Sequence, residues 1–446
     1  MVILGLGSNI GDRLANLRKA LRAIKQLNDV SVLQVSPVYI SDALLPENAP
    51  ADWDMPYLNL AIRADVACTP EELLPQLKKI EWTIGRKPEK RHWGPREVDI
   101  DILAWDDRVI DTESLTVPHA SLQERPFALW PLADVAPFWR FPLTGTNHDL
   151  TAGEIAEKWG SRFSGDAPFH TRQIYQRIDM PSIVGILNIT PDSFSDGGLF
   201  SSVDDVLAQA KIEMQQGAEI LDIGAESTAP NAKPITPGEE WQRLLPVLMT
   251  ILENKKSFFI PPKISVDTRH AETAEKVLSL GIDWLNDVTG LEDPKMCEVI
   301  AASVADCVIM HHVSIPASRA HIVPRDVDIV PFLYEWAARR IDDVQKKGID
   351  HSRIIFDPGI GFGKIPEQSL ALIQHADQFK SLGVRILIGH SRKSFLTPFT
   401  PLPPKERDVE TLAITLNLAK KPIDYLRVHD VFMTARGMKV ASFLSN

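Results

Sequence analysis

The chain has 446 residues, of which 44% are hydrophobic and 24% charged, so it is long enough for two or three domains with buried cores. Its formal net charge is −11 and it lacks a block of basic residues, which argues against nucleic acid as a partner. The three cysteines Cys68, Cys297 and Cys307 support neither a disulfide framework nor a zinc site, and they fit a cytoplasmic protein. The start has no basic leader and the chain has no long apolar run, so neither export nor membrane insertion is expected.

Residues 1–165 alternate strand-like and helix-like patterns in the order βαββαβ. The expected strands cover 2–9, 30–41, 57–66 and 96–105, and the expected helices cover 13–27 and 70–85, with a further short helix over 124–135. This order is typical of an α+β ferredoxin-like domain. Residues 166–180 lose the periodicity and are expected to be a linker.

Residues 181–446 repeat a different unit, in which a short β-branched run is followed by an amphipathic helical stretch. Eight such units predict an α/β (β/α)8 TIM barrel, whose active site is built at the carboxyl ends of the strands. Polar side chains stand at these ends: Asn188, Asp222, Asp267, Asn286, His311, Asp357, Lys393 and His429. Helix caps are the alternative explanation, which accounts for one or two of these residues more easily than for all of them.

Two carboxylates, Asp99 and Asp101, are expected on the same face of the strand that ends the first βαββαβ unit, because strand side chains alternate. Such a pair suits Mg²⁺ that carries nucleotide phosphates. A lone pair of this kind is more often a solvated strand face, but here the basic loop 86–96 directly precedes it. A phosphate-binding loop of the GxxxxGK[ST] type does not occur in this half, so a nucleotide would be held in another way.

The first domain resembles 6-hydroxymethyl-7,8-dihydropterin pyrophosphokinase in the motifs LGLGSNIGDR, YLN, RHWGPREVDIDIL, LTVPH and RPFALWPL. The resemblance implies transfer of pyrophosphate from ATP to the pterin hydroxymethyl group with release of AMP. It assigns two Mg²⁺ ions to Asp99 and Asp101 and a catalytic role to Arg96. The substrate-binding residues that it implies are Tyr57, Asn59, Glu81, Arg86, Arg91, Trp93, Thr116, His119, Arg125 and Phe127.

The second domain resembles dihydropteroate synthase in ILNITPDSFSDGG, DIGAEST, ISVDT, NDVTG, FDPGIGFGK, GHSRKS and RVHD. The resemblance implies condensation of the pterin pyrophosphate with p-aminobenzoate to 7,8-dihydropteroate, and it makes sulfonamides expected inhibitors. Lys393, Arg427 and His429 would surround the departing pyrophosphate, with Mg²⁺ on Asn188. The other residues that it implies are Asp222, Thr228, Asp267, Asn286, Met310, Asp357, Gly361, Phe362 and Ser394. The two halves would then catalyse successive steps of folate biosynthesis.

The sequence departs from the two family patterns at Pro88, His92, Ser114 and Ala229, and the loop over 42–56 is longer than usual. Two other interpretations therefore stand beside the bifunctional enzyme. The barrel could be a pterin-dependent methyltransferase subunit, although the basic strand ends suit pyrophosphate better. One half could also be a non-catalytic pterin-binding or scaffolding module. The sequence leaves assembly into a homo-oligomer open.

Overall fold

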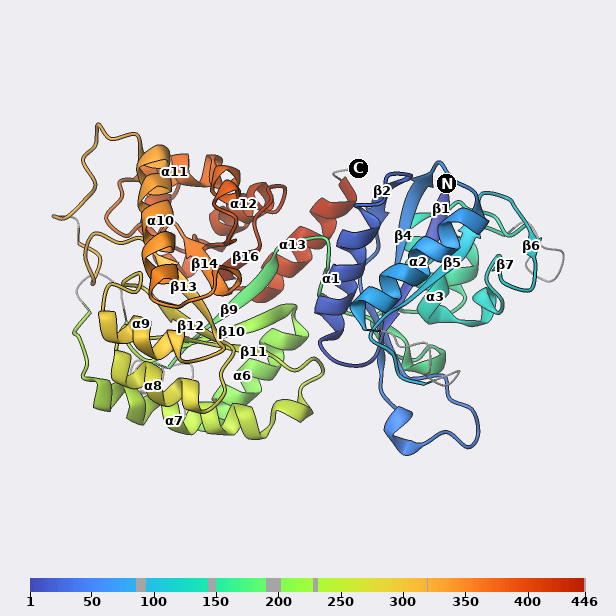
Figure 1. The fold of residues 1–446 in the computed structure, drawn as a ribbon, viewed down its shortest axis with the longest axis horizontal. Coiled ribbons are helices and arrows are strands. Elements are labelled where there is room, and N and C mark those ends of the chain that lie inside the picture. The colour runs from blue at the N-terminus through green and yellow to red at the C-terminus, as the bar shows by residue number, and fades with distance from the viewer. Residues whose placement is uncertain (86–93, 143–149, 190–201, 228–231, 319, 445–446) are drawn as a thin grey trace. The chain divides into compact units, whose positions relative to one another are not determined.

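The computed structural model describes residues 1–85, 94–142, 150–189, 202–227, 232–318 and 320–444. Contacts between Cα atoms divide the chain into two compact units (Figure 1). The first comprises Met1–Asp179 with Ser442–Asn446, and the second comprises Met180–Ala441.

The first unit contains an antiparallel sheet in the order β5-β1-β4-β3-β8, with β2 also paired to β4. The strands are β1 (Val2–Ser8), β2 (Val30–Val35), β3 (Tyr39–Ser41), β4 (Tyr57–Val66), β5 (Asp99–Trp105) and β8 (Arg172–Gln173), and a separate hairpin pairs β6 (Ile110–Asp111) with β7 (Thr116–Val117). The helices are α1 (Arg13–Ile24), α2 (Pro70–Ile84), α3 (Pro126–Val135) and α4 (Ala152–Glu157). The expected ferredoxin-like order is confirmed. The stretch 30–41 forms two strands, because Pro37 between them has no N–H to give to a ladder.

The local sequence explains where α2 begins and ends. Thr69 accepts a hydrogen bond from the Glu72 backbone N–H, and the Glu72 side chain accepts one from Thr69 N in return, which is a capping box. Pro70 occupies the first helical turn, where its missing N–H costs nothing. Gly85 ends the helix with a φ of 138°, a conformation that side chains oppose.

The two faces of the sheet have different surroundings. Ile100 and Ile102 are buried on one face of β5, whereas Leu103 packs on the other face against Trp130 of α3. Asp99 and Asp101 share the face of Leu103, because strand side chains alternate. The prediction that both carboxylates face the same way is confirmed, and the face is the one that α3 partly covers.

The segment 166–180 contributes to the sheet of the first unit. It contains β8, in which Arg172 pairs with Ile40 and Gln173 with Tyr39. Further along, Arg177 donates from Nη2 to the backbone oxygen of Val35, at 2.9 Å. Residues that were expected to be a linker are therefore bound to the strands of this unit.

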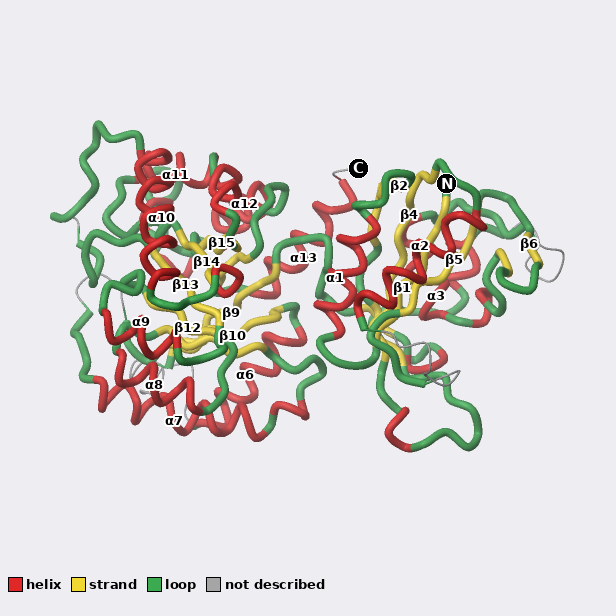
Figure 2. Tube along the Cα trace, viewed as in Figure 1, coloured by secondary structure: helices red, strands yellow, loops and turns green. Residues whose placement is uncertain are grey.

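The second unit is a closed barrel of eight parallel strands within a ring of helices (Figure 2), as predicted. The strands are β9 (Ser182–Asn188), β10 (Ala218–Gly224), β11 (Lys263–Asp267), β12 (Trp284–Asp287), β13 (Asp306–Met310), β14 (Ile354–Asp357), β15 (Arg385–Ile388) and β16 (Tyr425–Val428). The helices are α6 (Val203–Gln215), α7 (Pro237–Glu253), α8 (Ala271–Ser279), α9 (Pro294–Ala301), α10 (Ile329–Lys346), α11 (Pro366–Gln374), α12 (Asp408–Leu418) and α13 (Val431–Leu444), the last of which belongs to this unit as far as Ala441. No helix among these described residues has the length and apolarity to cross a membrane.

One layer of apolar side chains closes the barrel interior and comes from most of the strands. It consists of Val184, Ile220, Trp284, Val308, Ile355 and Leu387, with Tyr425 packed against it. This filled core leaves the strand ends as the place for chemistry. Cys297 of α9 and Cys307 of β13 are also buried in this unit, whereas Cys68 of the first unit is partly exposed.

Outside the barrel strands, α6 buries a carboxyl group against β9. Glu213 is 4% exposed, and burial raises its pKa to about 7. Its neighbour Gly185 leaves the space that this carboxyl group needs, because a Cβ at position 185 would lie 2.2 Å from Glu213 Oε2.

Candidate active sites

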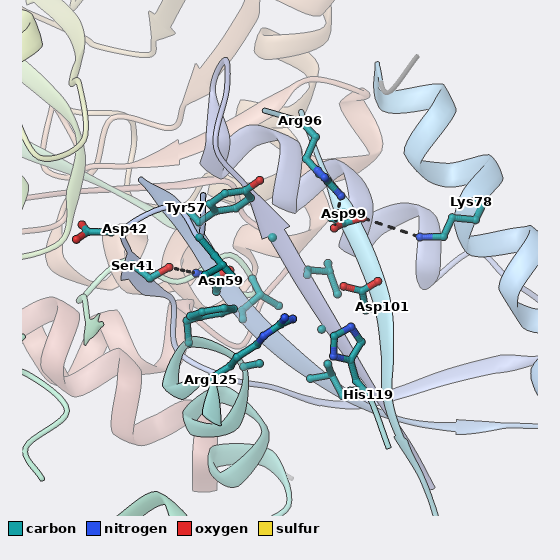
Figure 3. Close-up of a pocket in the computed structure, with 18 residues that line it drawn as sticks. Ser41, Asp42, Tyr57, Asn59, Lys78, Arg96, Asp99, Asp101, His119 and Arg125 are labelled. Atoms are coloured by element: carbon teal, nitrogen blue, oxygen red, sulfur yellow. Dashed lines mark hydrogen bonds and ion pairs between the residues drawn. The ribbon is translucent and has the colours of Figure 1, made fainter. Parts of the chain in front are cut away.

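The first unit has a cavity of about 380 Å³ on the α3 face of its sheet (Figure 3). Strands β1, β3, β4 and β5 contribute to its walls, together with the residues that begin α3. It is lined by Gly5, Leu6, Gly7, Ser41, Asp42, Leu44, Tyr57, Asn59, Leu60, Lys78, Arg96, Asp99, Asp101, Leu103, His119, Arg125, Phe127 and Ala128.

The acidic pair of β5 forms one side of this cavity, between two cations (Figure 3). Arg96 Nη1 donates to Asp99 Oδ2 at 2.7 Å, and Lys78 Nζ lies 3.9 Å from Asp99 Oδ1. Burial, together with the charge of Asp99, raises the pKa of Asp101 to about 7. Burial and the neighbouring carboxylate thus favour the protonated form of Asp101, even with these two cations nearby.

Glycines in β1 keep the floor of the cavity open beneath an amide. Asn59 donates from Nδ2 to Ser41 Oγ at 3.0 Å, which fixes the amide plane. A Cβ at Gly7 would lie 3.3 Å from Asn59 Oδ1, and one at Gly5 would lie 3.0 Å from the side chain of Leu103. Larger residues at these two positions would therefore narrow the cavity.

The opposite side of the cavity is basic and aromatic. Arg125 directly precedes α3, and Phe127 lies in its first turn. Burial and the nearby charge of Arg125 lower the pKa of His119, so this imidazole is neutral near pH 7. His119 Nδ1 is buried and finds no hydrogen-bond partner among the described residues.

Most of the residues expected in the first site meet in this cavity: Tyr57, Asn59, Arg96, Asp99, Asp101, His119, Arg125 and Phe127. Glu81 and Thr116 do not line it. The Glu81 carboxylate accepts from Ile100 N and from Lys78 Nζ, each at 2.7 Å, and Thr116 is exposed in the β6–β7 hairpin. Arg86, Arg91 and Trp93 lie outside the described residues, as do Pro88 and His92.

Sequence reasoning missed several residues of the cavity wall. Lys78 comes from α2, and Asp42 and Leu44 begin the long loop whose contacts the sequence left unassigned. Their amino-acid types carry no signal of a site. The spacing of Lys78 and Glu81 could have indicated that Lys78 lies near the site, since side chains three residues apart on a helix are neighbours and Glu81 was already expected there.

In the barrel, Arg427 of β16 connects two carboxylates at the carboxyl ends of neighbouring strands. It donates from Nε to Asp222 Oδ2 at 2.6 Å and from Nη2 to Asp267 Oδ2 at 3.1 Å. Asp222 is 1% exposed and also accepts from Ser265 Oγ at 2.5 Å and from Asn286 Nδ2 at 3.2 Å. Asp222, expected to bind substrate, thus lies beneath Arg427 and orients it.

A second group lies after β14 and β15. Asp357 Oδ1 accepts from Gly359 N at 2.7 Å, and Lys393 Nζ donates to Ile360 O at 2.7 Å. The same ammonium lies 4.7 Å from the centre of the Phe362 ring. Burial lowers the pKa of Lys393 to about 8, against the opposing charge of Asp357.

The remaining residues expected in the barrel site lie near these groups or at the surface. Met310 packs with Phe362, and a Cβ at Gly361 would lie 3.5 Å from Lys393 Cδ. Asn188 and Ser394 are exposed, at the end of β9 and at the start of the turn that follows Lys393. Thr228 and Ala229 lie outside the described residues.

His429, expected beside the departing pyrophosphate, has a neutral imidazole. Its Nδ1 lies 3.0 Å from Ser391 Oγ. Burial, together with the charges of Arg392 and Arg427, lowers the pKa of His429 to about 3. The imidazole is neutral at physiological pH before substrate binds, so it offers a hydrogen bond rather than a charge.

A cluster beside the barrel site has the composition of a metal centre, with Glu226, Glu240 and His270 offering ligand atoms within 4.8 Å of one another. Arg269, however, donates from Nε and Nη2 to the two oxygens of Glu226, at 2.9 and 2.8 Å. Ile235 N donates to the same carboxylate, at 3.2 Å. A guanidinium thus already neutralises Glu226, and we interpret the cluster as a hydrogen-bond network.

Comparison with known proteins identifies both units. The family model for 7,8-dihydro-6-hydroxymethylpterin-pyrophosphokinase matches residues 3–137, and that for pterin binding enzymes matches residues 184–429. Two pterin enzymes are therefore joined in one chain.

Relatives with both halves and solved structures of the barrel support this class. The folate synthesis bifunctional protein of Chlamydia trachomatis is 33% identical over 99% of this chain and 98% of its own length. Dihydropteroate synthase of Anaplasma phagocytophilum, solved with 6-hydroxymethylpterin-monophosphate, is 39% identical over 59% of this chain and 99% of its own, with a TM-score of 0.54. The Yersinia pestis enzyme, solved with a sulfonamide drug complex, is 30% identical over 60% of this chain and 94% of its own, with a TM-score of 0.55.

The chain belongs to the family of bifunctional folate synthesis proteins. It is an enzyme that transfers pyrophosphate from ATP to 6-hydroxymethyl-7,8-dihydropterin and condenses the product with p-aminobenzoate to 7,8-dihydropteroate.

Proposed function

We propose that the cavity on the α3 face of the first unit is the site of pyrophosphoryl transfer, and that the Arg427 and Lys393 groups of the barrel form the site of condensation. The observation that carries the first assignment is the meeting of an acidic pair, a basic side and a fixed amide in one cavity of about 380 Å³. A dihydropterin and the phosphates of ATP need these three surfaces together.

The acidic pair fits Mg²⁺. Asp99 and Asp101 present hard oxygen ligands on one strand face, and a bound Mg²⁺ would favour the charged form of Asp101, whose pKa burial and the charge of Asp99 raise. Bound Mg²⁺ would neutralise phosphate charge during the transfer. Arg96, which holds Asp99 at 2.7 Å, would orient that carboxylate and contact the phosphates.

On the pterin side, the Asn59 amide would hydrogen-bond to the heterocycle, because Ser41 already holds its orientation. Phe127 would stack on the pterin ring and Tyr57 would close the edge of the cavity. In this arrangement the hydroxymethyl oxygen would point toward the acidic pair, where the terminal phosphates of ATP would lie. His119 and Arg125 would stabilise the charge that spreads over the transferring group.

In the barrel, Asp267, Asn286 and Asp357 would accept and donate hydrogen bonds to the pterin edge at the strand ends. Arg427 and Lys393 would stabilise the departing pyrophosphate, and His429 would donate a hydrogen bond to it. The arylamine nitrogen would then attack the pterin methylene carbon as the bond from that carbon to the pyrophosphate oxygen breaks, and the nitrogen would lose one proton. Phe362 and Ser394 would border the arylamine, together with Thr228.

Further proposals concern the metal of the barrel, its inhibitors, the location of the enzyme and its assembly. Asn188 offers one amide oxygen for Mg²⁺ at the end of β9. The sulfonamide bound to the Yersinia pestis enzyme supports competition between sulfonamides and p-aminobenzoate in this barrel. The cytoplasmic location is supported by three free cysteines, and a homo-oligomer stays a prediction.

The two assignments can be separated by measuring AMP and dihydropteroate on purified variants. Asp101→Asn keeps the shape of the side chain but removes its charge, so AMP formation should fall about 100-fold or more. Its rate with supplied pterin pyrophosphate and p-aminobenzoate should stay unchanged. Lys393→Ala should lower the rate of dihydropteroate formation and leave AMP formation unchanged.

The matched control is Asp65→Asn, an exposed position in β4 that does not line the cavity. It should leave both rates unchanged. Full AMP formation by Asp101→Asn would rule out the acidic pair as the site of transfer, whereas loss of both activities in either variant would mean that the chain had unfolded.

A further inference from the structure

The segment 165–170 returns to the edge of the first cavity. Pairing of β8 with β3 places it opposite Asp42, a residue that lines the cavity beside Ser41 (Figure 3). Asp42 N donates to Phe169 O at 2.8 Å, and Asp42 Oδ2 lies 2.6 Å from His170 Nδ1. Phe169 and His170 thus contact Asp42 in the wall of the cavity.

The backbone of this segment has an unfavourable conformation. Phe169 and His170 have φ values of 59° and 44°, although neither is a glycine. Consecutive residues in the left-handed region are costly, because the Cβ atom approaches the backbone carbonyl. Just after them, Thr171 is 0% exposed and donates from its hydroxyl group to Pro168 O at 2.7 Å, which fixes the turn.

The turn brings one aromatic ring against another. Phe169 meets Phe127 edge to face, with ring centres 5.4 Å apart and planes at 74°. Both side chains are partly exposed, and Phe127 lines the cavity. Phe169 therefore stands where it restricts a ring that lines the cavity.

We propose that Phe169 is a positioning residue for the pyrophosphoryl transfer, which holds the Phe127 ring in the orientation that stacks on the dihydropterin. The proposal rests on the assignment of the pterin to this cavity. Phe169 would act before the substrate arrives, because a ring already held in place loses less freedom on binding.

The test is the KM for hydroxymethyl dihydropterin in the first reaction at saturating ATP. The free energy of an edge-to-face aromatic pair corresponds to a change of about 2- to 12-fold in a binding constant. Phe169→Ala should therefore raise this KM by about that factor. The KM for ATP should stay unchanged, as should the rate of the barrel reaction. Phe169→Tyr retains the ring and should restore the pterin KM.

The matched control is Phe163→Ala. Phe163 comes from the same part of the chain and stacks on Tyr175 with ring centres 5.6 Å apart, but it does not line the cavity. It should leave the pterin KM unchanged. An equal rise in Phe163→Ala would mean that any lost aromatic packing has this effect, and it would overturn the proposal.

A double-mutant cycle separates this inference from the site assignment. If Phe127→Ala raises the pterin KM, and Phe169→Ala adds nothing further in that background, Phe169 acts through Phe127. Additive effects, or no effect of Phe169→Ala beside a clear effect of Phe127→Ala, would overturn the inference alone. No effect of Phe127→Ala would instead reject the assignment of the pterin to this cavity, and the inference with it.

Discussion

Two ionisable residues of the barrel site, Asp267 and Lys393, have pKa values that burial moves toward one another. Burial is the largest cause at Asp267, whose pKa is raised to about 8, and Arg427 opposes the shift. Burial likewise lowers the pKa of Lys393 to about 8. The carboxyl group of Asp267 and the ammonium group of Lys393 thus titrate in the same pH range. The loss of a proton from either group makes the electrostatic potential at the leaving pyrophosphate more negative.

We predict that the barrel reaction weakens as the pH rises through about 8. The ammonium form of Lys393 exists below its pKa and is lost above it. The logarithm of kcat/KM for pterin pyrophosphate should therefore fall with pH at a slope of about −1 above that pKa. In Lys393→Arg the guanidinium stays charged, so the fall should move to higher pH. The measurement is kcat/KM between pH 6.5 and about 10.

Lys405→Arg is the control, because Lys405 is exposed outside the site and the change is chemically the same. Its pH profile should match that of the unchanged enzyme. If Lys393→Arg also kept that profile, another group such as Asp267 would be responsible for the fall.

Patterns of alternation and strand ends were sufficient to predict many of the site residues. Alternation placed Asp99 and Asp101 on one strand face, and strand-end reasoning located Asp267 and Asp357. The contact of Lys78 with Asp99 was not predictable, because it depends on how α2 lies across β5. Strand-end position alone also could not show that Asp222 is covered by Arg427.

At the level of elements, α6 carries the carboxyl group of Glu213 into the packing against β9. Gln209 Nε2 donates to Glu213 Oε1 at 3.2 Å, while Oε2 is buried without a hydrogen bond among the described residues. Burial raises the pKa of this group from 4.5 to about 7. The folded barrel therefore binds a proton there that the unfolded chain releases.

The sign of the effect on stability follows from this shift. The contribution of Glu213 to the free energy of unfolding is fully present below pH 4.5 and declines as the pH rises toward 7. Above pH 7 the ionised carboxylate lowers the free energy of unfolding by up to about 3 kcal/mol. Glu213→Gln mimics the protonated group. We predict that it raises the free energy of unfolding at pH 8 by about 1 to 3 kcal/mol and changes it little at pH 5.

Urea unfolding of the full chain at the two pH values measures this difference. Glu219→Gln is a suitable comparison, since Glu219 lies in β10 of the same unit but is partly exposed. The burial argument would be contradicted if Glu213→Gln gave equal changes at pH 5 and pH 8.

Elements differ in how far the sequence predicts them. Each barrel strand was found from its β-branched run, and α2 from Thr69, Pro70 and Gly85. β8 has two residues, which is too short for a period to appear, and its place is fixed by tertiary partners. Among these partners is the Tyr39 hydroxyl group, which donates to Asp134 at 2.7 Å and accepts from Gln173 at 2.8 Å.

For the whole molecule, each proposed site consists, within the described residues, of side chains from a single unit. The intermediate that connects the two reactions is a small molecule. We therefore predict that an equal mixture of Asp101→Asn and Lys393→Ala chains makes dihydropteroate from hydroxymethyl dihydropterin, ATP and p-aminobenzoate. The product should appear after a lag, because the pyrophosphate ester must accumulate in solution first.

Each variant alone should make little product and serves as the control. Absence of product in the mixture, while each variant retains its own remaining reaction, would mean that the intermediate does not pass through solution between chains. Addition of pterin pyrophosphate to the mixture should abolish the lag.

The two units differ in how accessible their thiol groups are to reagents. Cys307 is 0% exposed in β13, and burial raises its pKa to about 12, so almost none of it exists as the nucleophilic thiolate. Cys297 is equally buried in α9 of the same unit, whereas Cys68 of the first unit is partly accessible. A thiol-directed label would therefore mark the first unit in the folded enzyme and would reach the barrel cysteines as the barrel opens. The chain thus carries its own reporter of barrel unfolding, one that needs no introduced probe.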